Sequence, residues 1–144
     1  MSNYVVHKEI RIKAEPPKVW QALTDPEQTK KYFFHCKVRS TWKVGDSISF
    51  KGKMFFIIPI EMEGKIEEIN PGSLLKYTLH NSKSNSQSTV TDTLNYEDGE
   101  TVLTISDDVG DGEGAKERYE RSQKGWDKVL SGLKRYVESQ SQQG

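Results

Sequence analysis

The hydrophobic positions divide the chain into two unlike parts near Gly110. Before this point, short alternating segments separated by turn residues predict β-strands. After it, one segment from Gly114 to about Ser139 has apolar residues at spacings of three and four, the period of an amphipathic helix. At about 1.5 Å per residue this helix would be roughly 36 Å long, so it can cover one curved antiparallel sheet. Its predicted stripe consists of Tyr119, Ser122, Trp126, Val129, Leu130, Leu133 and Val137.

Alternation and turn chemistry define the expected strands. In the first strand, Val6, Ile10 and Ile12 share one face, and Lys8 is the polar exception on that face. Gly64 interrupts an apolar face, which predicts a bend or the close approach of another backbone. The remaining strands are expected at Ser47–Phe50, around Met54–Ile69, and at Ser73–Leu79, Ser88–Tyr96 and Thr101–Ser106.

Two short helices are predicted between the first two strands. Pro16 and Pro17 suit the first turn of a helix, where no backbone donor is needed. Asp25 then ends this helix and caps a second one that begins with Pro26. The result is an elbow of two helices.

Length and composition narrow the possible classes. The 144 residues suffice for one domain, which we expect over 1–138, followed by a flexible polar tail over 139–144. Lys plus Arg equals Asp plus Glu at 21 each, which argues against a nucleic acid partner. Cys36 is the only cysteine, and neither a leader peptide nor a membrane span is apparent, so we expect a cytoplasmic protein.

Several segments, in their order and spacing, resemble the START-like (SRPBCC) superfamily, and in particular its branch named after activators of the heat-shock chaperone ATPase. The resemblance covers nearly the whole chain. This sequence departs from the pattern of that branch at two places. Tyr32-Phe33-Phe34 stands where the branch commonly has a tryptophan, and residues 42–46 contain one glycine where the branch frequently has a pair. The matching segments are Ile10–Ala14, Val19–Glu27, Gly64–Pro71, Leu75–Thr78, and Gly125-Trp126 with Leu130, Leu133 and Tyr136.

The resemblance implies an α+β helix-grip fold, in which a curved antiparallel sheet surrounds the C-terminal helix and two short helices close one end. Members of the superfamily bind lipids, sterols, polyketides or phenolics, act as cyclases, or assist a chaperone, so the fold alone does not decide the activity.

The candidate ligand-binding residues lie on the inward faces of the predicted strands, on one helix stripe and on the short helices. Periodicity alone favours the simpler interpretation that they pack as an ordinary core, whereas the resemblance favours a cavity, typically of about 300 to 1,000 Å³ for drug-sized ligands. The residues are Trp20, Tyr32, Phe33, Phe50, Met62, Ile66, Leu75, Tyr77, Val90, Asp92, Leu103, Ile105, Trp126, Val129, Leu130 and Leu133.

Asp92 is the most informative polar candidate. It shares a strand face with Val90 and Leu94, so an unbroken strand would bury its carboxylate, where an unpaired charge is costly. Either a partner or a bulge that turns Asp92 to solvent must then exist. The same reasoning applies more weakly to Asp107.

No cofactor or metal site is expected. The three histidines lack ligand spacing, and the acidic run 107–113 does not place oxygen donors where a calcium loop requires them. His35 and Cys36 are sequence neighbours, which point to opposite faces of a strand and make a poor nucleophile pair. An enzyme is therefore less expected than a binding protein.

The most apolar run, Met54–Ile60, has two interpretations. It is either a hairpin tip folded under the short helices or a contact surface for a chaperone or another protein, with Phe55, Phe56, Ile57 and Ile58 as its residues. Three functions remain open at this stage. They are binding of a small hydrophobic or amphipathic molecule, a chaperone-associated interaction, and a cyclase or hydrolase activity that uses the same cavity.

Overall fold

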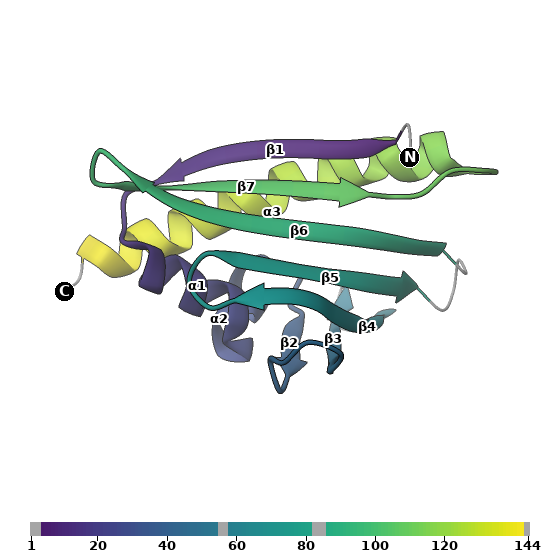
Figure 1. Cartoon of the computed structure of the whole chain (residues 1–144), viewed down its shortest axis with the longest axis horizontal. Helices are drawn as coiled ribbons and strands as arrows, with labels where there is room; N and C mark the ends of the chain where they lie inside the picture. Colours follow the sequence, from purple (N-terminus) through teal and green to yellow (C-terminus); the bar gives the residue numbers. More distant parts are fainter. Residues whose placement is uncertain (1–3, 55–57, 82–85, 143–144) are drawn as a thin grey trace.

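The computed structural model describes residues 4–54, 58–81 and 86–142 (Figure 1). Two short helices follow the first strand, six further strands come next, and one long helix ends the order of elements. The elements are β1 (Val5–Ile12), α1 (Pro16–Thr24), α2 (Pro26–Tyr32), β2 (Lys37–Ser40), β3 (Ser47–Met54), β4 (Ile58–Asn70), β5 (Leu74–Asn81), β6 (Ser86–Glu97), β7 (Glu100–Asp108) and α3 (Ala115–Gln142).

Seven strands form one antiparallel sheet in the order β1-β7-β6-β5-β4-β3-β2. Consecutive strands from β2 to β7 are neighbours, whereas β1 lies at the opposite edge from β2. The α1–α2 elbow makes the connection between these edges, and α3 lies along the concave face (Figure 1). The α+β helix-grip fold predicted from the sequence is therefore confirmed.

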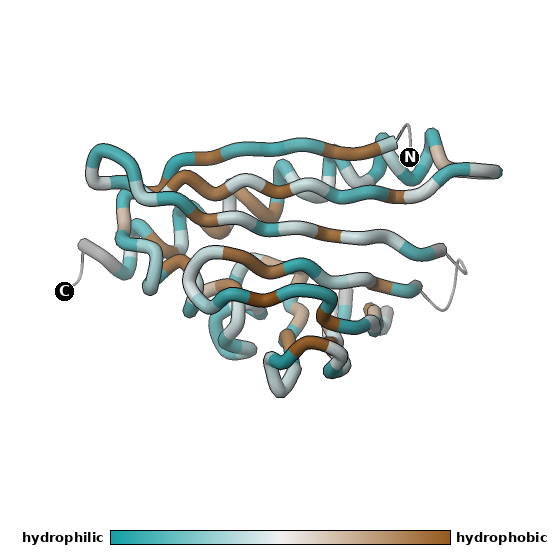
Figure 2. The backbone as a smooth tube through the Cα atoms, in the orientation of Figure 1, coloured by the Kyte–Doolittle hydropathy of each residue, from teal (hydrophilic) through white to brown (hydrophobic). Residues whose placement is uncertain are grey.

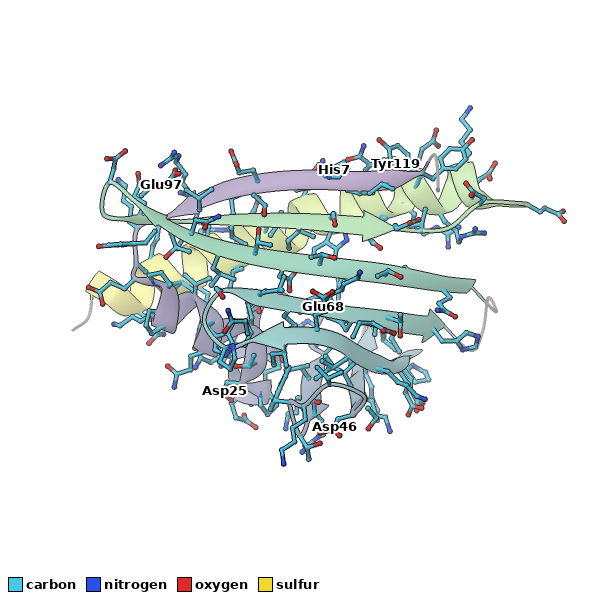
Figure 3. The ribbon with its side chains drawn as sticks, viewed as in Figure 1. His7, Asp25, Asp46, Glu68, Glu97 and Tyr119 are labelled. Carbon is cyan, nitrogen blue, oxygen red and sulfur yellow. The ribbon has the colours of Figure 1, made fainter. Side chains whose placement is uncertain are left out.

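Alternation along the strands produces the two faces of the sheet. In the β6–β7 ladder, Leu94 lies opposite Leu103 and Asp92 opposite Ile105, and all four side chains are buried. Hydrophobic and hydrophilic positions alternate along the strands (Figure 2). Polar side chains, with His7 and Glu68 as labelled examples, extend from the face away from α3 (Figure 3). The core therefore lies between the concave face and the helices.

The short helices begin and end as the sequence predicted. Asp25 caps α2 by accepting a hydrogen bond from the backbone of Glu27 at 2.9 Å, and proline occupies the first turn of both helices. The Tyr32 hydroxyl donates to the carbonyl of Ala22 at 2.7 Å and thereby fixes the angle between α1 and α2. These two contacts hold the elbow across the end of the sheet.

Strand β2 was not predicted, because its four residues are too few to show a pattern. A buried side chain fixes it instead. The Thr29 hydroxyl of α2 donates to the carbonyl of Cys36 at 2.9 Å and accepts from the backbone of Val38 at 3.0 Å. One threonine therefore joins the second helix to the edge strand.

Gly64 occupies a place where the backbones of β4 and β5 come very close. A Cβ atom at this position would lie 1.6 Å from the carbonyl oxygen of Thr78. The register between the two strands also shifts between Ile66 and Glu68, which marks a bulge. The close approach is one of the two outcomes expected from the sequence at Gly64. The bulge, which was not predicted, bends the strand nearby.

The long helix extends past the expected end at Ser139 and into the predicted tail, reaching Gln142. Three polar contacts attach it to the β1 region, one of which is a hydrogen bond that Lys134 Nζ donates to the carbonyl of Arg11. Lys8, the exception on the inner face of β1, pairs with Asp127 at 2.9 Å, and Glu138 accepts from the backbone of Lys13 at 3.3 Å. The polar position in β1 is thus explained by an ion pair with α3.

We predict that Gly64→Ala destabilises the fold by about 3 kcal/mol or more, since the added methyl group must displace backbone rather than a flexible side chain. Gly125→Ala in α3 is the matched control. No atom lies within 4 Å of its added Cβ, and alanine favours the helix, so its free energy of unfolding should rise by about 0.5 to 1 kcal/mol. Chemical denaturation measures both, and equal midpoints for Gly64→Ala and the unchanged protein would contradict the close approach.

Candidate functional site

A small cavity lies between the concave face of the sheet, α2 and α3. Its volume, counted as the space open to the centre of a water molecule, is about 20 Å³. This is room for about one water, so the drug-sized volume expected from the sequence is not present. The lining residues are Leu23, Thr29, Tyr32, Phe33, Phe50, Leu75, Tyr77, Asp92, Ile105, Trp126, Val129, Leu130 and Leu133.

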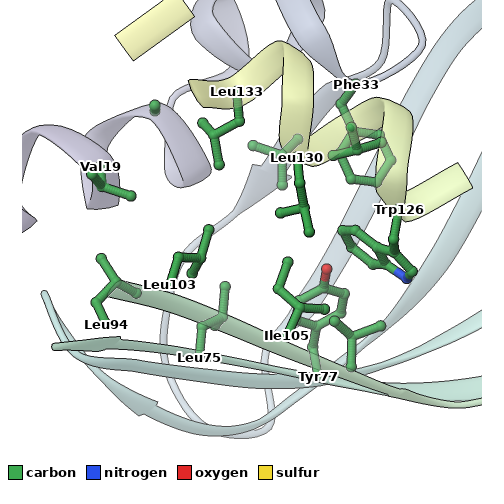
Figure 4. Packing of buried hydrophobic residues seen from close by; sticks show 14 of the residues in the cluster. Val19, Phe33, Leu75, Tyr77, Leu94, Leu103, Ile105, Trp126, Leu130 and Leu133 are labelled. Carbon is green, nitrogen blue, oxygen red and sulfur yellow. The ribbon is translucent and has the colours of Figure 1, made fainter. Parts of the chain in front are cut away.

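Four aromatic rings form a continuous group along one side of the cavity. Phe33 stacks on Phe50 with ring centroids 5.0 Å apart and meets Trp126 edge to face at 5.8 Å. Phe50 in turn lies 5.8 Å from Tyr77. In Figure 4, Trp126, Leu130 and Leu133 point from α3 toward the sheet, and the Tyr77 hydroxyl points back toward the helix. The wall therefore combines residues from α2, α3, β3 and β5.

Asp107 holds the central indole in place. Its Oδ2 accepts a hydrogen bond from Trp126 Nε1 at 2.9 Å and another from the Ser122 hydroxyl at 2.6 Å. Burial raises the pKa of this carboxyl, while the two hydrogen bonds act in the opposite direction. Asp107 thus orients the ring that α3 contributes to the cavity.

Asp92 is buried within the lining, with 3% of its surface exposed. Strand β6 is regular here, so no bulge turns the side chain to solvent. Its Oδ1 has no hydrogen-bond partner among the described residues. Burial, together with the charge of Asp107, raises the pKa of Asp92 to about 8, so the carboxyl is protonated at neutral pH.

The other titratable groups of the interior stay neutral. Burial and the nearby Asp92 raise the pKa of Tyr32 and of Tyr77 well above the usual tyrosine value. Burial also raises the pKa of the Cys36 thiol to about 11, which removes the thiolate that nucleophilic chemistry needs.

Most predicted site residues meet at the cavity, but five lie elsewhere. Ile66, Val90 and Leu103 are fully packed in the core, while Trp20 and Met62 are half-buried against it. Two lining residues were not predicted from the sequence. Leu23 was identifiable from its place on the buried face of α1, whereas Thr29 carries no pattern that separates it from a surface threonine.

No group of three or more His, Cys, Asp or Glu residues is placed to hold a metal ion in the described ranges. Nor is any helix of those ranges long and apolar enough to cross a membrane.

The proposed partner run cannot be placed. Residues 55–57, and the side chain of Ile58, lie outside the described residues, so this surface stays a prediction. Three large apolar side chains are exposed among the described residues, namely Phe34 at 37%, Val44 at 65% and Tyr96 at 55%.

Sequence comparison identifies one family. The profile for "Activator of Hsp90 ATPase homolog 1-like protein" matches residues 13–138. No curated protein matches the chain significantly.

Solved structures share the fold across nearly the whole chain. A protein from Cytophaga hutchinsonii is 27% identical, with coverage of 99% of both chains and a TM-score of 0.77. A protein from Chromobacterium violaceum is 23% identical, covering 94% of this chain and 97% of that one at a TM-score of 0.78. The Aha1 dimer from Colwellia psychrerythraea is 19% identical, with coverage of 93% and 96% and a TM-score of 0.74.

We predict that Asp92→Asn stabilises the protein progressively as the pH rises. The folded-state pKa of about 8 exceeds the unfolded value of 3.8, so the folded protein binds the proton more tightly. The contribution of this carboxyl to the free energy of unfolding is therefore greatest below about pH 4, and it decreases as the pH rises from about 4 to about 8. The asparagine variant should gain about 1.4 kcal/mol per pH unit over this window relative to the unchanged protein.

Urea denaturation at a series of pH values measures this difference. Glu9→Gln, which alters an exposed carboxyl on β1, is the control and should follow the unchanged protein. Parallel stability curves for Asp92→Asn and the unchanged protein would show that Asp92 does not titrate abnormally.

Proposed function

We propose that this chain, which belongs to the family of Activator of Hsp90 ATPase homolog 1-like proteins, binds a small hydrophobic or amphipathic molecule between its concave sheet and α3. The observation that supports this proposal is the cavity, whose aromatic and aliphatic lining includes one buried carboxyl group with no hydrogen-bond partner for its Oδ1 among the described residues. Pockets for small molecules have this composition, with a mostly apolar wall and few polar groups.

The carboxyl is hard to explain as part of a core built only for stability. An isolated buried acid costs free energy that a similar apolar side chain would not, and the described residues offer Asp92 Oδ1 no partner that offsets the cost. Local departures of this kind concentrate at functional sites. The lining therefore favours recognition over packing alone.

A ligand larger than a water molecule must displace side chains, because the cavity holds about 20 Å³. The connection between α2 and β2 is where we expect this movement. Phe33 forms part of the wall, and the two residues after it, Phe34 and His35, have φ angles of 49° and 60°, in the left-handed region that non-glycine residues rarely adopt. Rearranging this strained connection would withdraw the Phe33 ring without disturbing the sheet.

Binding should be visible at the indole of Trp126. We predict that at least one of 1-octanol, octanoate, octylamine and 2-naphthol shifts the Trp126 indole resonance in an NMR titration. Val129→Phe, which fills the cavity from α3, should weaken that binding at least tenfold, because the ligand loses its apolar contact. Ser131→Phe, at an exposed position of the same helix, is the matched control. The proposal fails if none of the four probes perturbs the indole at millimolar concentration.

A second candidate is a chaperone-associated module, favoured by the family itself. We predict that in this case the purified chain accelerates ATP hydrolysis by Hsp90, and that replacing Phe55 and Phe56 with serine reduces the acceleration. The same replacements should leave the binding of small molecules unchanged. An ATPase rate that does not respond to the chain would exclude this candidate.

A further inference from the structure

The cavity has a one-sided electrostatic character. Asp92 is the only acidic side chain of its lining, and the lining contains no Lys, Arg or His. A second acid, Asp107, lies on the adjacent strand β7, two residues after Ile105, which pairs with Asp92. The charge of Asp107 raises the pKa of Asp92. A ligand that enters this space therefore meets the carboxyl group of Asp92, ionised or protonated, and no cationic side chain among the lining residues.

We propose that the ligand's polar group is an ammonium, so that the site takes an amphipathic amine whose head contacts Asp92 and whose hydrocarbon part lies along α3. This inference rests on the proposed binding function and specifies its ligand class. A charge-assisted hydrogen bond from the amine would satisfy Asp92 Oδ1, which has no partner among the described residues. The Oδ1 of Asp107 also lacks a partner there, but Asp107 does not line the cavity.

The aromatic group supports the same ligand. Phe33, Phe50, Tyr77 and Trp126 line the same cavity as Asp92 and pack against one another there. Aromatic rings attract cations, most strongly where water is excluded. An ammonium group is also about the size of a water molecule, so the present volume of about 20 Å³ accommodates the head. The tail then requires only the movement of the neighbouring apolar side chains.

Other polar heads fit less well. Near pH 8, where Asp92 ionises, a carboxylate would bring a second negative charge beside it without a lining cation to separate them, which is costly in a buried site. An alcohol can donate one hydrogen bond to Asp92, but it gains neither charge assistance nor attraction to the rings. The site should therefore rank an amine above an alcohol and an alcohol above a carboxylate.

Binding of an ammonium is coupled to loss of a proton. The Asp92 carboxyl is protonated below about pH 8, so pairing with the amine releases that proton to solvent. The groups that face it are Tyr32 of α2, with Tyr136 of α3 beside it, Tyr77 of β5 and Asp107 of β7. Burial keeps Tyr32 and Tyr77 neutral, and Asp107 remains hydrogen-bonded to Trp126 and Ser122. Affinity for the amine should consequently rise by up to tenfold per pH unit and level off above about pH 8.

A head-group series tests the assignment on the unchanged protein. Octylamine, 1-octanol and octanoate share one chain length and differ only in the head. We expect octylamine to bind at least tenfold more tightly than either of the others near pH 8, with an affinity that falls as the pH is lowered. The measurements are the NMR titration at the Trp126 indole and calorimetry, which also reports the released proton through the dependence of the heat on the buffer.

The matched variants are Asp92→Asn, which preserves size and removes the charge, and Glu9→Gln on the outer face. Octylamine should bind Asp92→Asn no better than octanol does and without pH dependence, whereas Glu9→Gln should behave as the unchanged protein. Octanol or octanoate binding as tightly as octylamine would overturn the ammonium assignment while leaving a binding protein. Absence of binding by all three and by 2-naphthol would overturn the binding function itself. The series on the unchanged protein decides the question even if Asp92→Asn does not fold.

Discussion

The structure depends on a single constraint: one amphipathic helix must cover the concave face of a seven-stranded sheet. A helix is about 10 Å across, which is much narrower than the sheet, so α3 cannot fill the concavity alone. The bend at Gly64 and the elbow of α1 and α2 bring the remaining walls toward it. The small cavity lies where these three parts meet, beside the residues that each of them contributes.

The sequence predicts most of this arrangement because its main features are periodic. The apolar stripe of α3 and the cap at Asp25 follow from spacing and local chemistry, and the structure contains both. Spacing left Asp92 open between burial with a partner and a bulge toward solvent, and the structure buries it without a partner for its Oδ1 among the described residues. Strand β2 escaped prediction because a tertiary contact, through Thr29, holds it. The cavity volume was also overestimated, since side-chain rotamers such as that of Phe33 determine how much space remains, and no pattern in the sequence records them.

The two buried acids illustrate how neighbours on one face of a sheet acquire different roles. Asp107 has donors in Ser122 and Trp126 and so acts as a structural acceptor that orients an indole. Asp92 lies one strand away, has no such donors for its Oδ1, and is held in its neutral form by burial. The difference arises because the donors on α3, Ser122 and Trp126, reach the acid on β7. The helix therefore determines which acid is available for recognition.

The two edge strands of the sheet differ in length, with four residues in β2 and eight in β1. An exposed edge can template the addition of a strand from another molecule, and a very short edge offers too few backbone groups for stable addition. Self-association by continued β-pairing is consequently disfavoured at β2. If two copies joined through their sheets, the join would occur at β1, beside the ion pair of Lys8 with α3.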